Sequence, residues 1–368
     1  MDLTTIVDCI APAAGRQKSA GVMTTSTTTT GLVVVTGGSG YIAGYCIAEL
    51  LNNGRRVRAT IRNLARAEEV RATIGRISSN AAAIEFVAAD LNSDAGWANA
   101  VAGADYVLHV ASPAPAVSPK DDDEVVRPAR DGTLRVLKAA RDAGVKRVVM
   151  TSSIAAIAYG RGERLQPFSE VDWTDETNRK DTSPYARSKT IAERAAWAWQ
   201  KSEGGRLELA TVNPVMVLGP VLGSDFSASI EVIKKQLDRS VPALPRLGYN
   251  VVDVRDVAHL HLLAMMAPEA SGQRFIASSD FYWMKDIARI LKQELGDSAR
   301  NVPSISIPDF LVRIFAISDP VLRGALIDLG KRRLVSSDKA RRILHWTTRP
   351  TKETILETAK SLLAEGIV

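Results

Sequence analysis

A tyrosine and a lysine stand four residues apart in the segment TSPYARSK, residues 182–189, and helix formers follow as far as Gln200. Residues at this spacing lie on one face of a helix, about one turn apart. Pro184 suits a first helical turn, because its missing N–H has no partner there. An ammonium ~4–5 Å from a phenol oxygen favours the phenolate by about 3–4 kcal/mol at an effective dielectric of ~20. Tyr185 and Lys189 are therefore a candidate proton-transfer pair, although the same spacing occurs by chance in many proteins.

A serine follows an apolar run that reads as a strand, in the segment VVMTSS, residues 148–153. A hydroxyl at the carboxyl end of a parallel strand lies at the edge of the sheet where ligands bind. There it can donate a hydrogen bond to a carbonyl oxygen and stabilise the charge that develops on it. The alternative is a serine that only caps the following turn.

A glycine-rich turn joins a strand to a helix in the segment VVVTGGSGYIAG, residues 33–44. Gly37 permits the tight turn, Gly40 lets the backbone approach a pyrophosphate, and Ala43 keeps the helix close to the strand. The helix N-terminus offers free N–H groups and the positive end of the helix dipole. Strand and helix signals flank the turn on both sides, so we expect dinucleotide binding rather than a simple connection.

The end of the next strand selects the cofactor. The segment VRATIRN, residues 57–63, has no acid to bind the ribose hydroxyls of NAD, and Arg62 is placed for the 2′-phosphate of NADP. Arg66 could assist or could be a solvated helix charge. Asp90 follows the third strand, where its carboxylate could bind the adenine amino group or cap a helix. His109 ends the fourth strand and is expected to be a packed core residue.

These motifs require a fold in which strands and helices alternate. The expected strands are 32–35, 57–61, 84–88, 106–110, 145–150 and 207–212, and the expected helices are 41–53, 64–74, 96–102, 123–143 and 185–202. Near-continuous Val, Ile and Leu runs between helices predict a parallel sheet covered on both faces. The fold class is therefore α/β, a Rossmann-type doubly wound sheet with right-handed crossovers.

The domain organisation follows from where the alternation of strands and helices starts and stops. Residues 1–30 are rich in Ala, Ser and Thr and read as a disordered or processed extension. Residues 31–214 form the dinucleotide-binding domain. Residues 215–368 read as a smaller, mostly helical substrate lobe of the same folding unit, in which strands near 251–252 and 274–277 could join the sheet.

Composition excludes several classes of protein. With 46% hydrophobic and 24% charged residues among 368, the chain is an ordinary globular protein, and no apolar run is long enough to span a bilayer. The net charge of +6 is spread along the chain, so we expect no nucleic-acid partner. Cys9 and Cys46 are the only cysteines, which fits a reducing, cytoplasmic setting without disulfides. Asp253 and Asp256 lack histidine or carboxylate neighbours at ligand spacing, so we expect no metal and read them as a structural turn and a helix cap.

Taken together, these motifs resemble those of the extended short-chain dehydrogenases/reductases, and within them the dihydroflavonol 4-reductase-like ketone and aldehyde reductases. The resemblance covers about residues 31–365. It rests on TGGSGYIA (36–43), VRATIR (57–62), HVASP (109–113), TSS (151–153), YARSK (185–189), NPV (213–215) and VDVRDVA (252–258), in the order of the family. The family match identifies Ser153 as the catalytic serine, with Ser152 its nearest competitor.

The resemblance implies NADPH-dependent, reversible reduction of a carbonyl to an alcohol. Tyr185 would protonate the alkoxide, Lys189 would support the tyrosine and hold the nicotinamide ribose, and Ser153 would orient the carbonyl. The expected cofactor contacts are Thr36, Gly37, Ser39, Gly40, Tyr41, Ile42, Arg62, Arg66, Asp90, Leu91, Val110, Ala111, Ser112, Tyr185, Lys189, Pro214 and Val215. The expected substrate contacts are Pro113, Tyr159, Met216 and Phe226, an apolar set that suits an aliphatic or aromatic carbonyl compound.

The chain also departs from its plant relatives. Plant flavonoid reductases carry an asparagine or aspartate shortly after the serine, whereas residues 154–159 read IAAIAY, so we do not expect a dihydroflavonol substrate. The Asn-Trp-Tyr-Cys-Tyr signature of cinnamoyl-CoA reductases is missing as well. A sugar-nucleotide epimerase or dehydratase is an alternative, but the substrate lobe has no arginine cluster to hold a pyrophosphate. A non-catalytic NADP sensor is a second alternative. We expect a small-molecule substrate, no membrane partner, and a monomer or homodimer.

Overall fold

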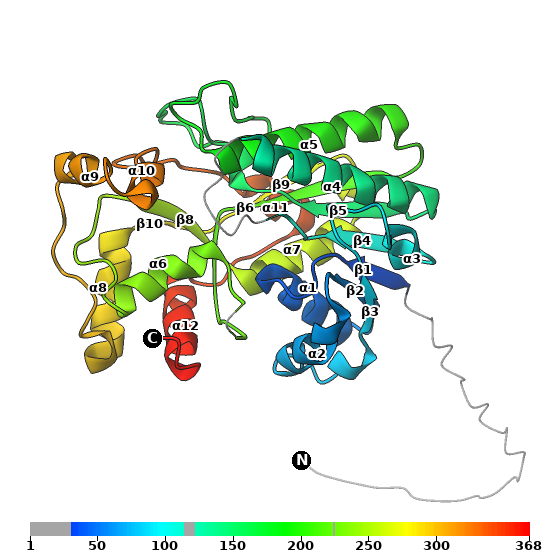
Figure 1. Cartoon of the computed structure of the whole chain (residues 1–368), viewed down its shortest axis with the longest axis horizontal. Helices are drawn as coiled ribbons and strands as arrows, with labels where there is room; N and C mark the ends of the chain where they lie inside the picture. The colour runs from blue at the N-terminus through cyan, green and yellow to red at the C-terminus, as the bar shows by residue number, and fades with distance from the viewer. Residues whose placement is uncertain (1–30, 114–121, 224) are drawn as a thin grey trace, which may run out of the picture.

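The computed structural model describes residues 31–113, 122–223 and 225–368 (Figure 1). Its large sheet has seven parallel strands in the order β3-β2-β1-β4-β5-β6-β9. These are β1 Leu32–Val35, β2 Arg56–Ile61, β3 Glu85–Ala88, β4 Tyr106–His109, β5 Arg147–Thr151, β6 Glu208–Pro214 and β9 Arg274–Ala277. Val35 pairs with Ala59 and Leu108, so the carboxyl ends of three central strands meet at one edge. In such a sheet the strand order reverses between β1 and β4, and ligands bind in the crevice there.

Helices cover both faces of this sheet, as expected from the buried strands (Figure 1). On one face lie α3 Trp97–Val101, α4 Asp123–Asp142 and α5 Pro184–Glu203, which share a core with the strands beneath them. On the other face lie α1 Tyr41–Asn52, α2 Ala67–Gly75 and α7 Val254–Met266. Every helix expected before Pro214 is present within a few residues, which confirms the Rossmann-type architecture.

The remainder of the chain adds a second sheet and more helices beside the first. The second sheet has the order β10-β8-β7, with β7 Met216–Leu218, β8 Gly248–Asp253 and β10 Phe281–Trp283. The helices are α6 Ala228–Leu237, α8 Met284–Leu295, α9 Asp309–Phe315, α10 Pro320–Ala325, α11 Asp338–Leu344 and α12 Thr351–Ala364. Five 3-10 turns are also present: η1 Leu64–Arg66, η2 Ala81–Ala83, η3 Ile154–Ala156, η4 Pro268–Ala270 and η5 Gly296–Ala299.

Only one of the two late strands joins the large sheet. The segment 274–277 is β9, which pairs in parallel with β6, whereas 251–252 lies within β8 of the second sheet. One hydrophobic core nevertheless runs from α1 and α7 through β8 to α12. The second sheet and the helices around it therefore pack against the seven-stranded sheet without a separate core.

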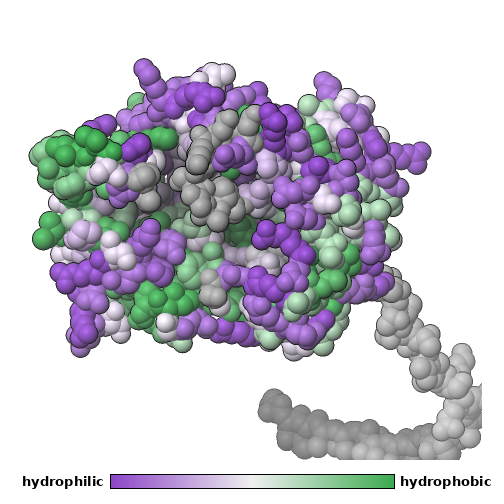
Figure 2. Space-filling model, viewed as in Figure 1, coloured by the Kyte–Doolittle hydropathy of each residue, from purple (hydrophilic) through white to green (hydrophobic). Residues whose placement is uncertain are grey.

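Four exposed apolar side chains gather on one part of the surface. Figure 2 shows this patch at the upper left, over α9 and α10, where Phe310, Ile314, Phe315 and Ile317 are each at least half exposed. Within the described residues, no helix combines the length and the apolar character that crossing a bilayer requires. Cys46 is a buried free thiol, and Cys9 lies outside the described residues.

Candidate cofactor and catalytic site

The turn between β1 and α1 is shaped for the close approach of another molecule. Gly37 has φ +71°, and a Cβ there would lie 3.0 Å from Cα of Ala111 at the end of β4. Gly40 is the N-cap of α1 and makes no side-chain hydrogen bond to the helix end. The first N–H groups of α1 therefore lack partners within the helix and carry the positive end of its dipole. This arrangement can bind a phosphate group.

Next to this turn lies a buried hydroxyl without a partner. Tyr41 is only 8% exposed, and its Oη has no hydrogen-bond partner among the described residues. Burial raises the pKa of this phenol well above its usual value, with a smaller contribution from Tyr45. Tyr41 and the glycines line a cavity of about 150 Å³ together with Arg66 and Asp225. That hydroxyl lies on the side of Gly219, where an added Cβ would be 3.2 Å from it, and Gly219 does not line the cavity, so the glycines and the start of α1 form the phosphate-sized space. The residues present thus fit the pyrophosphate of a dinucleotide.

Thr36 precedes the glycine turn and connects it to the end of β4 by hydrogen bonds. It was expected among the cofactor contacts, but it is fully buried. Its hydroxyl accepts a hydrogen bond from the N–H of Ala111 at 3.0 Å and lies 2.9 Å from Nδ1 of His109. Its expected place among the cofactor contacts stays a prediction. Thr36 joins the ends of β1 and β4 and thereby positions Gly37.

His109 is buried, as expected of a core histidine. Burial, and secondarily the positive charge of Lys189, lower the pKa of this imidazole from 6.5 to about 3. His261 on α7 is also buried, lies 2.7 Å from the hydroxyl of Thr151, and has its pKa lowered to about 4 by burial.

These two histidines predict an acid-sensitive fold. Each takes up a proton near pH 6.5 in the unfolded chain but only near pH 3–4 in the folded protein. The free energy of unfolding should therefore not depend on the two histidines above pH 6.5. It should fall by roughly 1 kcal/mol per pH unit for each histidine as the pH drops from there toward 4. Urea unfolding at pH 7, 6 and 5 measures this slope, and the double variant His109→Gln/His261→Gln should flatten it. An unchanged slope in the double variant would contradict the assignment.

The two arginines after β2 differ in their surroundings. Arg62 is exposed and makes no ion pair or hydrogen bond with another described residue. Arg66 donates to Glu69 at 2.9 and 2.5 Å and to Asp225 at 2.6 Å, and these carboxylates raise the pKa of its guanidinium. Of the two candidates for the 2′-phosphate, only Arg62 has its charge uncompensated.

The ends of β3 and β4 complete the edge on this side. One carboxylate oxygen of Asp90 accepts the N–H of Asn92 at 2.9 Å, which forms a local turn and leaves the other oxygen available. Val110, Ala111 and Ser112 follow β4 with partial or full exposure. The segment 114–121 that continues from Pro113 lies outside the described residues.

Tyr185 and Lys189 occupy the first turns of α5. Ser183 caps this helix through its hydroxyl, which accepts the N–H of Ala186 at 3.1 Å, and Pro184 opens the first turn as expected. Nζ of Lys189 lies 5.9 Å from the centre of the Tyr185 ring. The phenol is 53% exposed, whereas the lysine is 6% exposed. An accessible hydroxyl is thus paired with a buried cation beneath it.

The two serines after β5 have different partners. Ser152 donates to Glu193 at 2.5 Å and is committed to a buried network. Ser153 accepts the N–H of Ala155 at 3.1 Å, and its own proton has no acceptor among the described residues. The capping role that sequence reasoning kept as an alternative is therefore real, yet it leaves the Ser153 hydroxyl free to donate. This difference favours Ser153 over Ser152 as the group that binds a substrate carbonyl.

Glu193 fixes α5 to the sheet and was not foreseen from the sequence. It is fully buried one turn beyond Lys189. Besides Ser152, it accepts hydrogen bonds from Nδ2 of Asn213 at 2.8 Å and from Nε of Arg274 at 2.7 Å. Asn213 also donates to the carbonyl of Ser153 at 3.2 Å. The helix that carries Tyr185 is thus tied to β5, β6 and β9; the only hint in the sequence was an acid on an otherwise buried helix face.

A second cavity, of about 90 Å³, opens from the ends of β5 and β6 toward the substrate lobe. Its walls include Tyr159 and Met216, as expected, and also Val215 next to Pro214 at the end of β6. Phe226 packs against the main core instead, and neither it nor Pro113 lines this cavity. The remaining lining residues are Ile154, Ala158, Gly248, Tyr249, Asn250, Asp328, Lys331, Arg333 and Val335.

Part of the lining of this cavity is polar, and the expected apolar substrate contacts stay a prediction. The Tyr159 hydroxyl lies 3.4 Å from Asp328, and the guanidinium of Arg333 lies 4.5 Å from the centre of the Tyr159 ring. Burial raises the pKa of the Asp328 carboxyl. Both cations, Lys331 and Arg333, are bound to Asp181. These residues lie about 170 positions beyond Tyr159 in no recognisable motif, so the sequence could not bring them here.

The expectation that Asp253 and Asp256 form a structural turn and a helix cap is partly met. Asp253 is the N-cap of α7 and accepts the N–H of Arg255 at 2.8 Å. Asp256 is not a cap, because it accepts the N–H of Arg349 at 2.7 Å and pairs with that guanidinium. Both acids are structural, and no group of three metal-binding side chains occurs in the described ranges.

Comparisons with known proteins agree with this geometry. The NAD dependent epimerase/dehydratase family matches residues 33–277. Cinnamoyl-CoA reductase 1 of Petunia hybrida is 32% identical over 339 residues, which cover 91% of this chain and 93% of the relative. Tetraketide alpha-pyrone reductase 2 of Arabidopsis thaliana is 34% identical over 261 residues, or 69% of this chain and 80% of the relative. Yeast methylglyoxal/isovaleraldehyde reductase Gre2, solved with NADPH, superposes with a TM-score of 0.75 at 26% identity, covering 92% of this chain and all of that one.

The family match spans the glycine turn, both serines, the Tyr-Lys pair and β9. The two relatives cover 91% and 69% of this chain and are reductases by name. This chain therefore belongs to the NAD dependent epimerase/dehydratase family, the extended short-chain dehydrogenases/reductases, on its dihydroflavonol reductase-like branch.

Proposed function

We propose that this protein is an NADPH-dependent oxidoreductase that reversibly reduces the carbonyl of a small aldehyde or ketone to an alcohol. One observation carries the proposal: an exposed tyrosine lies beside a buried lysine on α5, and this helix contacts, through Thr190 and Ala155, the turn that begins at Ser153, whose hydroxyl is free to donate. The named activities of the similar reductases support the same reaction. NADPH supplies the hydride when it is bound.

The chain's own residues have separate tasks in this reaction. Ser153 donates a hydrogen bond to the carbonyl oxygen and stabilises the negative charge that develops there. Tyr185 gives its proton to that oxygen, and the positive charge of Lys189 stabilises the phenolate that remains. In the reverse direction the phenolate takes the proton from the alcohol. The N–H groups at the start of α1 hold the pyrophosphate, and Arg62 binds the 2′-phosphate.

The second cavity supports a small substrate with an apolar body. Val215 and Met216 are among its apolar walls, and the polar group of Tyr159, Asn250 and Asp328 suits a neutral hydroxyl or carbonyl of the substrate. The cations there are already bound to Asp181, so a carboxylate has no free partner among the described residues. We place the enzyme in the cytoplasm, in keeping with the free thiol of Cys46, as a monomer or homodimer.

A panel of aldehydes and ketones offered with NADPH, and in parallel with NADH, tests the activity. We expect steady NADPH consumption with at least one apolar carbonyl compound and slower consumption of NADH. Turnover of sugar nucleotides without net NADPH loss would point to an epimerase instead. A protein that binds NADPH and consumes none with any carbonyl would be a sensor.

Arg62→Ala tests the cofactor assignment separately from the chemistry. A charge-assisted hydrogen bond to a phosphate contributes about 1.5–3 kcal/mol, so the Kd for NADPH should rise roughly 10- to 100-fold. The Kd for NADH should change less than about twofold, because NADH has no 2′-phosphate to lose this contact. Equilibrium titration with both cofactors measures the difference. Arg56→Ala, at the opposite end of the same strand, is the matched control. Equal weakening of both cofactors would contradict the assignment.

A further inference from the structure

Arg66 at the proposed phosphate site is held by two acids. Its guanidinium lies 2.5 Å from Glu69 on α2 and 2.6 Å from Asp225, which comes from a distant part of the chain. All three residues line the same cavity as Gly38, Ser39 and Gly40. Counted as formal charges, one cation and two anions leave a net charge of −1. An anion that approaches Arg66 must therefore compete with carboxylates already in place.

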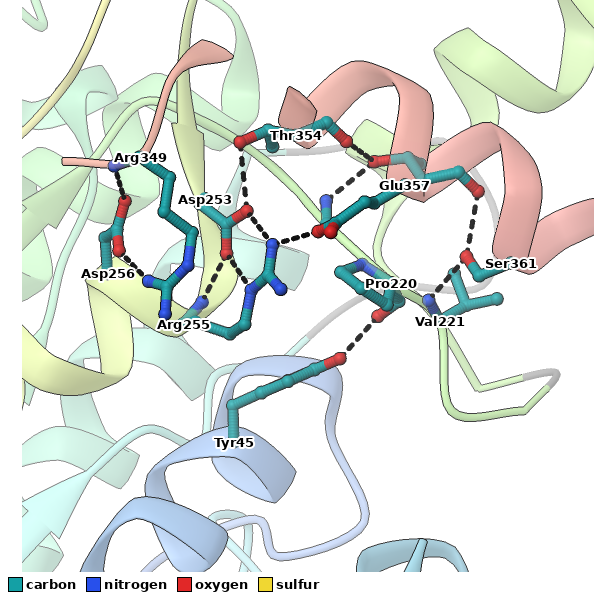
Figure 3. A network of polar contacts seen from close by, with 12 residues as sticks. Tyr45, Pro220, Val221, Asp253, Arg255, Asp256, Arg349, Thr354, Glu357 and Ser361 are labelled. Atoms are coloured by element: carbon teal, nitrogen blue, oxygen red, sulfur yellow. Dashed lines mark hydrogen bonds and ion pairs between the residues drawn. The ribbon is translucent and has the colours of Figure 1, made fainter. Parts of the chain in front are cut away.

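Asp225 follows residues 219–223 in the chain. Hydrogen bonds hold this segment, which we call the strap, on both sides. On one side, two hydroxyls of α12 accept hydrogen bonds from the backbone of the strap. The N–H of Gly219 donates to Thr358 at 2.7 Å, and the N–H of Val221 donates to Ser361 at 2.8 Å. On the other, the Tyr45 hydroxyl of α1 donates to the carbonyl of Pro220 at 2.8 Å. Figure 3 shows Pro220 and Val221 between Tyr45 and the helix that carries Ser361. The strap therefore crosses from the substrate lobe to the cofactor-binding helix.

Further contacts hold the strap and the helix to which it is bonded. Beyond Val221, the guanidinium of Arg76 donates to the carbonyl of Leu222 at 2.7 Å. The helix α12 is itself held by Asp253, which accepts the Thr354 hydroxyl at 2.9 Å, and by an ion pair between Arg255 and Glu357 (Figure 3). Asp225 follows Leu222 by three residues, so its carboxylate is kept near Arg66 by the fold as well as by charge.

We propose that Asp225 is a specificity-determining residue of the cofactor site, whose carboxylate competes with the 2′-phosphate for Arg66 and so moderates the preference for NADPH over NADH. The inference rests on the proposed function, in which Arg62 binds the 2′-phosphate, and adds Arg66, four residues further along, as a second partner that the acids hold back. A phosphate monoester carries a charge of about −1.5 to −2 at pH 7, so Asp225 repels it and also occupies its partner. NADH, with ribose hydroxyls in that position, has little to gain or lose.

Asp225→Asn removes the charge and keeps the shape. An exposed ion pair is worth about 0.2–1 kcal/mol, so the Kd for NADPH should fall by up to about fivefold at low salt. The gain should shrink in 0.5 M salt because screening weakens interactions between exposed charges. The Kd for NADH should stay within about twofold. Asp142→Asn is the matched control: it breaks an exposed pair with Arg141 at the end of α4, which leads into the opposite edge of the sheet.

Equilibrium titrations of NADPH and NADH decide the matter. Tighter NADPH binding in Asp225→Asn, absent in Asp142→Asn, supports the inference. Unchanged or weaker NADPH binding overturns it and would mean that Asp225 instead positions Arg66 for the phosphate. A gain of the same size in an Arg66→Ala background overturns the competition for Arg66. If Arg66→Ala alone leaves NADPH binding unchanged, the proposed phosphate contact fails. Weaker binding in Arg66→Ala without a gain in Asp225→Asn refutes only the role of Asp225.

Discussion

Replacing Tyr185 by phenylalanine is expected to lower kcat by at least ~10²-fold, the low end for a positioned proton donor. The variant keeps the ring against Lys189 and loses only the hydroxyl, so α5 and its cap should be unaffected. The alkoxide that forms on hydride transfer would have to take its proton from water. Because the phenol is 53% exposed, its loss leaves no buried polar group unpaired. The Kd for NADPH should therefore change little while turnover collapses.

Single-turnover and steady-state rates, with NADPH binding measured by titration, test this expectation. Tyr106→Phe is the matched control, because Tyr106 begins β4 at the edge of the sheet opposite the glycine turn. We expect that variant to turn over at the wild-type rate. Tyr185→Phe turnover within about twofold of the wild type would show that another group donates the proton, and the proposed mechanism would be wrong.

The parts of this site that could be predicted from sequence are those fixed by local chemistry. Gly37 needs φ +71° and leaves no room for a Cβ beside Ala111, so a glycine at that position reports the turn directly. Pro184 and the four-residue spacing of Tyr185 and Lys189 fix a helix start in the same way. The strands before Pro214 were predicted because apolar runs between helices have one stable arrangement, a parallel sheet covered on both faces.

The parts that could not be predicted depend on contacts between distant segments. Asp328 reaches Tyr159 across 169 residues, and Asp225 reaches Arg66 across 159. No periodicity or motif marks such pairs, since each partner looks like an ordinary solvated acid. Thr36 is a related case: only the fold shows that it is fully buried and that its hydroxyl lies within hydrogen-bond distance of His109 and Ala111. Burial of a polar residue is a tertiary property, so its role emerges only with the fold.

Glu193 is another residue whose role depends on contacts between distant segments. Replacing it by glutamine is expected to lower the free energy of unfolding by about 3–5 kcal/mol. Its two oxygens receive five hydrogen-bond donors, from Ser152, Trp197, Thr211, Asn213 and Arg274. An amide presents one oxygen and an NH₂ group, so at least one donor loses its acceptor. The guanidinium of Arg274 would be left buried without a counter-ion, and removing one partner of a buried pair costs far more than the pair contributes.

Urea unfolding at pH 7 measures this loss, and Glu85→Gln is its control. Glu85 pairs with Arg58 at 2.9 Å between the neighbouring strands β3 and β2, and it is 43% exposed, whereas the Glu193–Arg274 pair between α5 and β9 is buried, so the loss of Glu85 should cost no more than about 1 kcal/mol. A loss for Glu193→Gln no larger than the control's would mean that the network is not what joins α5 to the sheet. Because Asn213 holds the Ser153 carbonyl as well as Glu193, we also expect kcat to fall more than NADPH affinity in this variant. Equal effects on both would indicate general loosening of the fold rather than displacement of the serine relative to Tyr185.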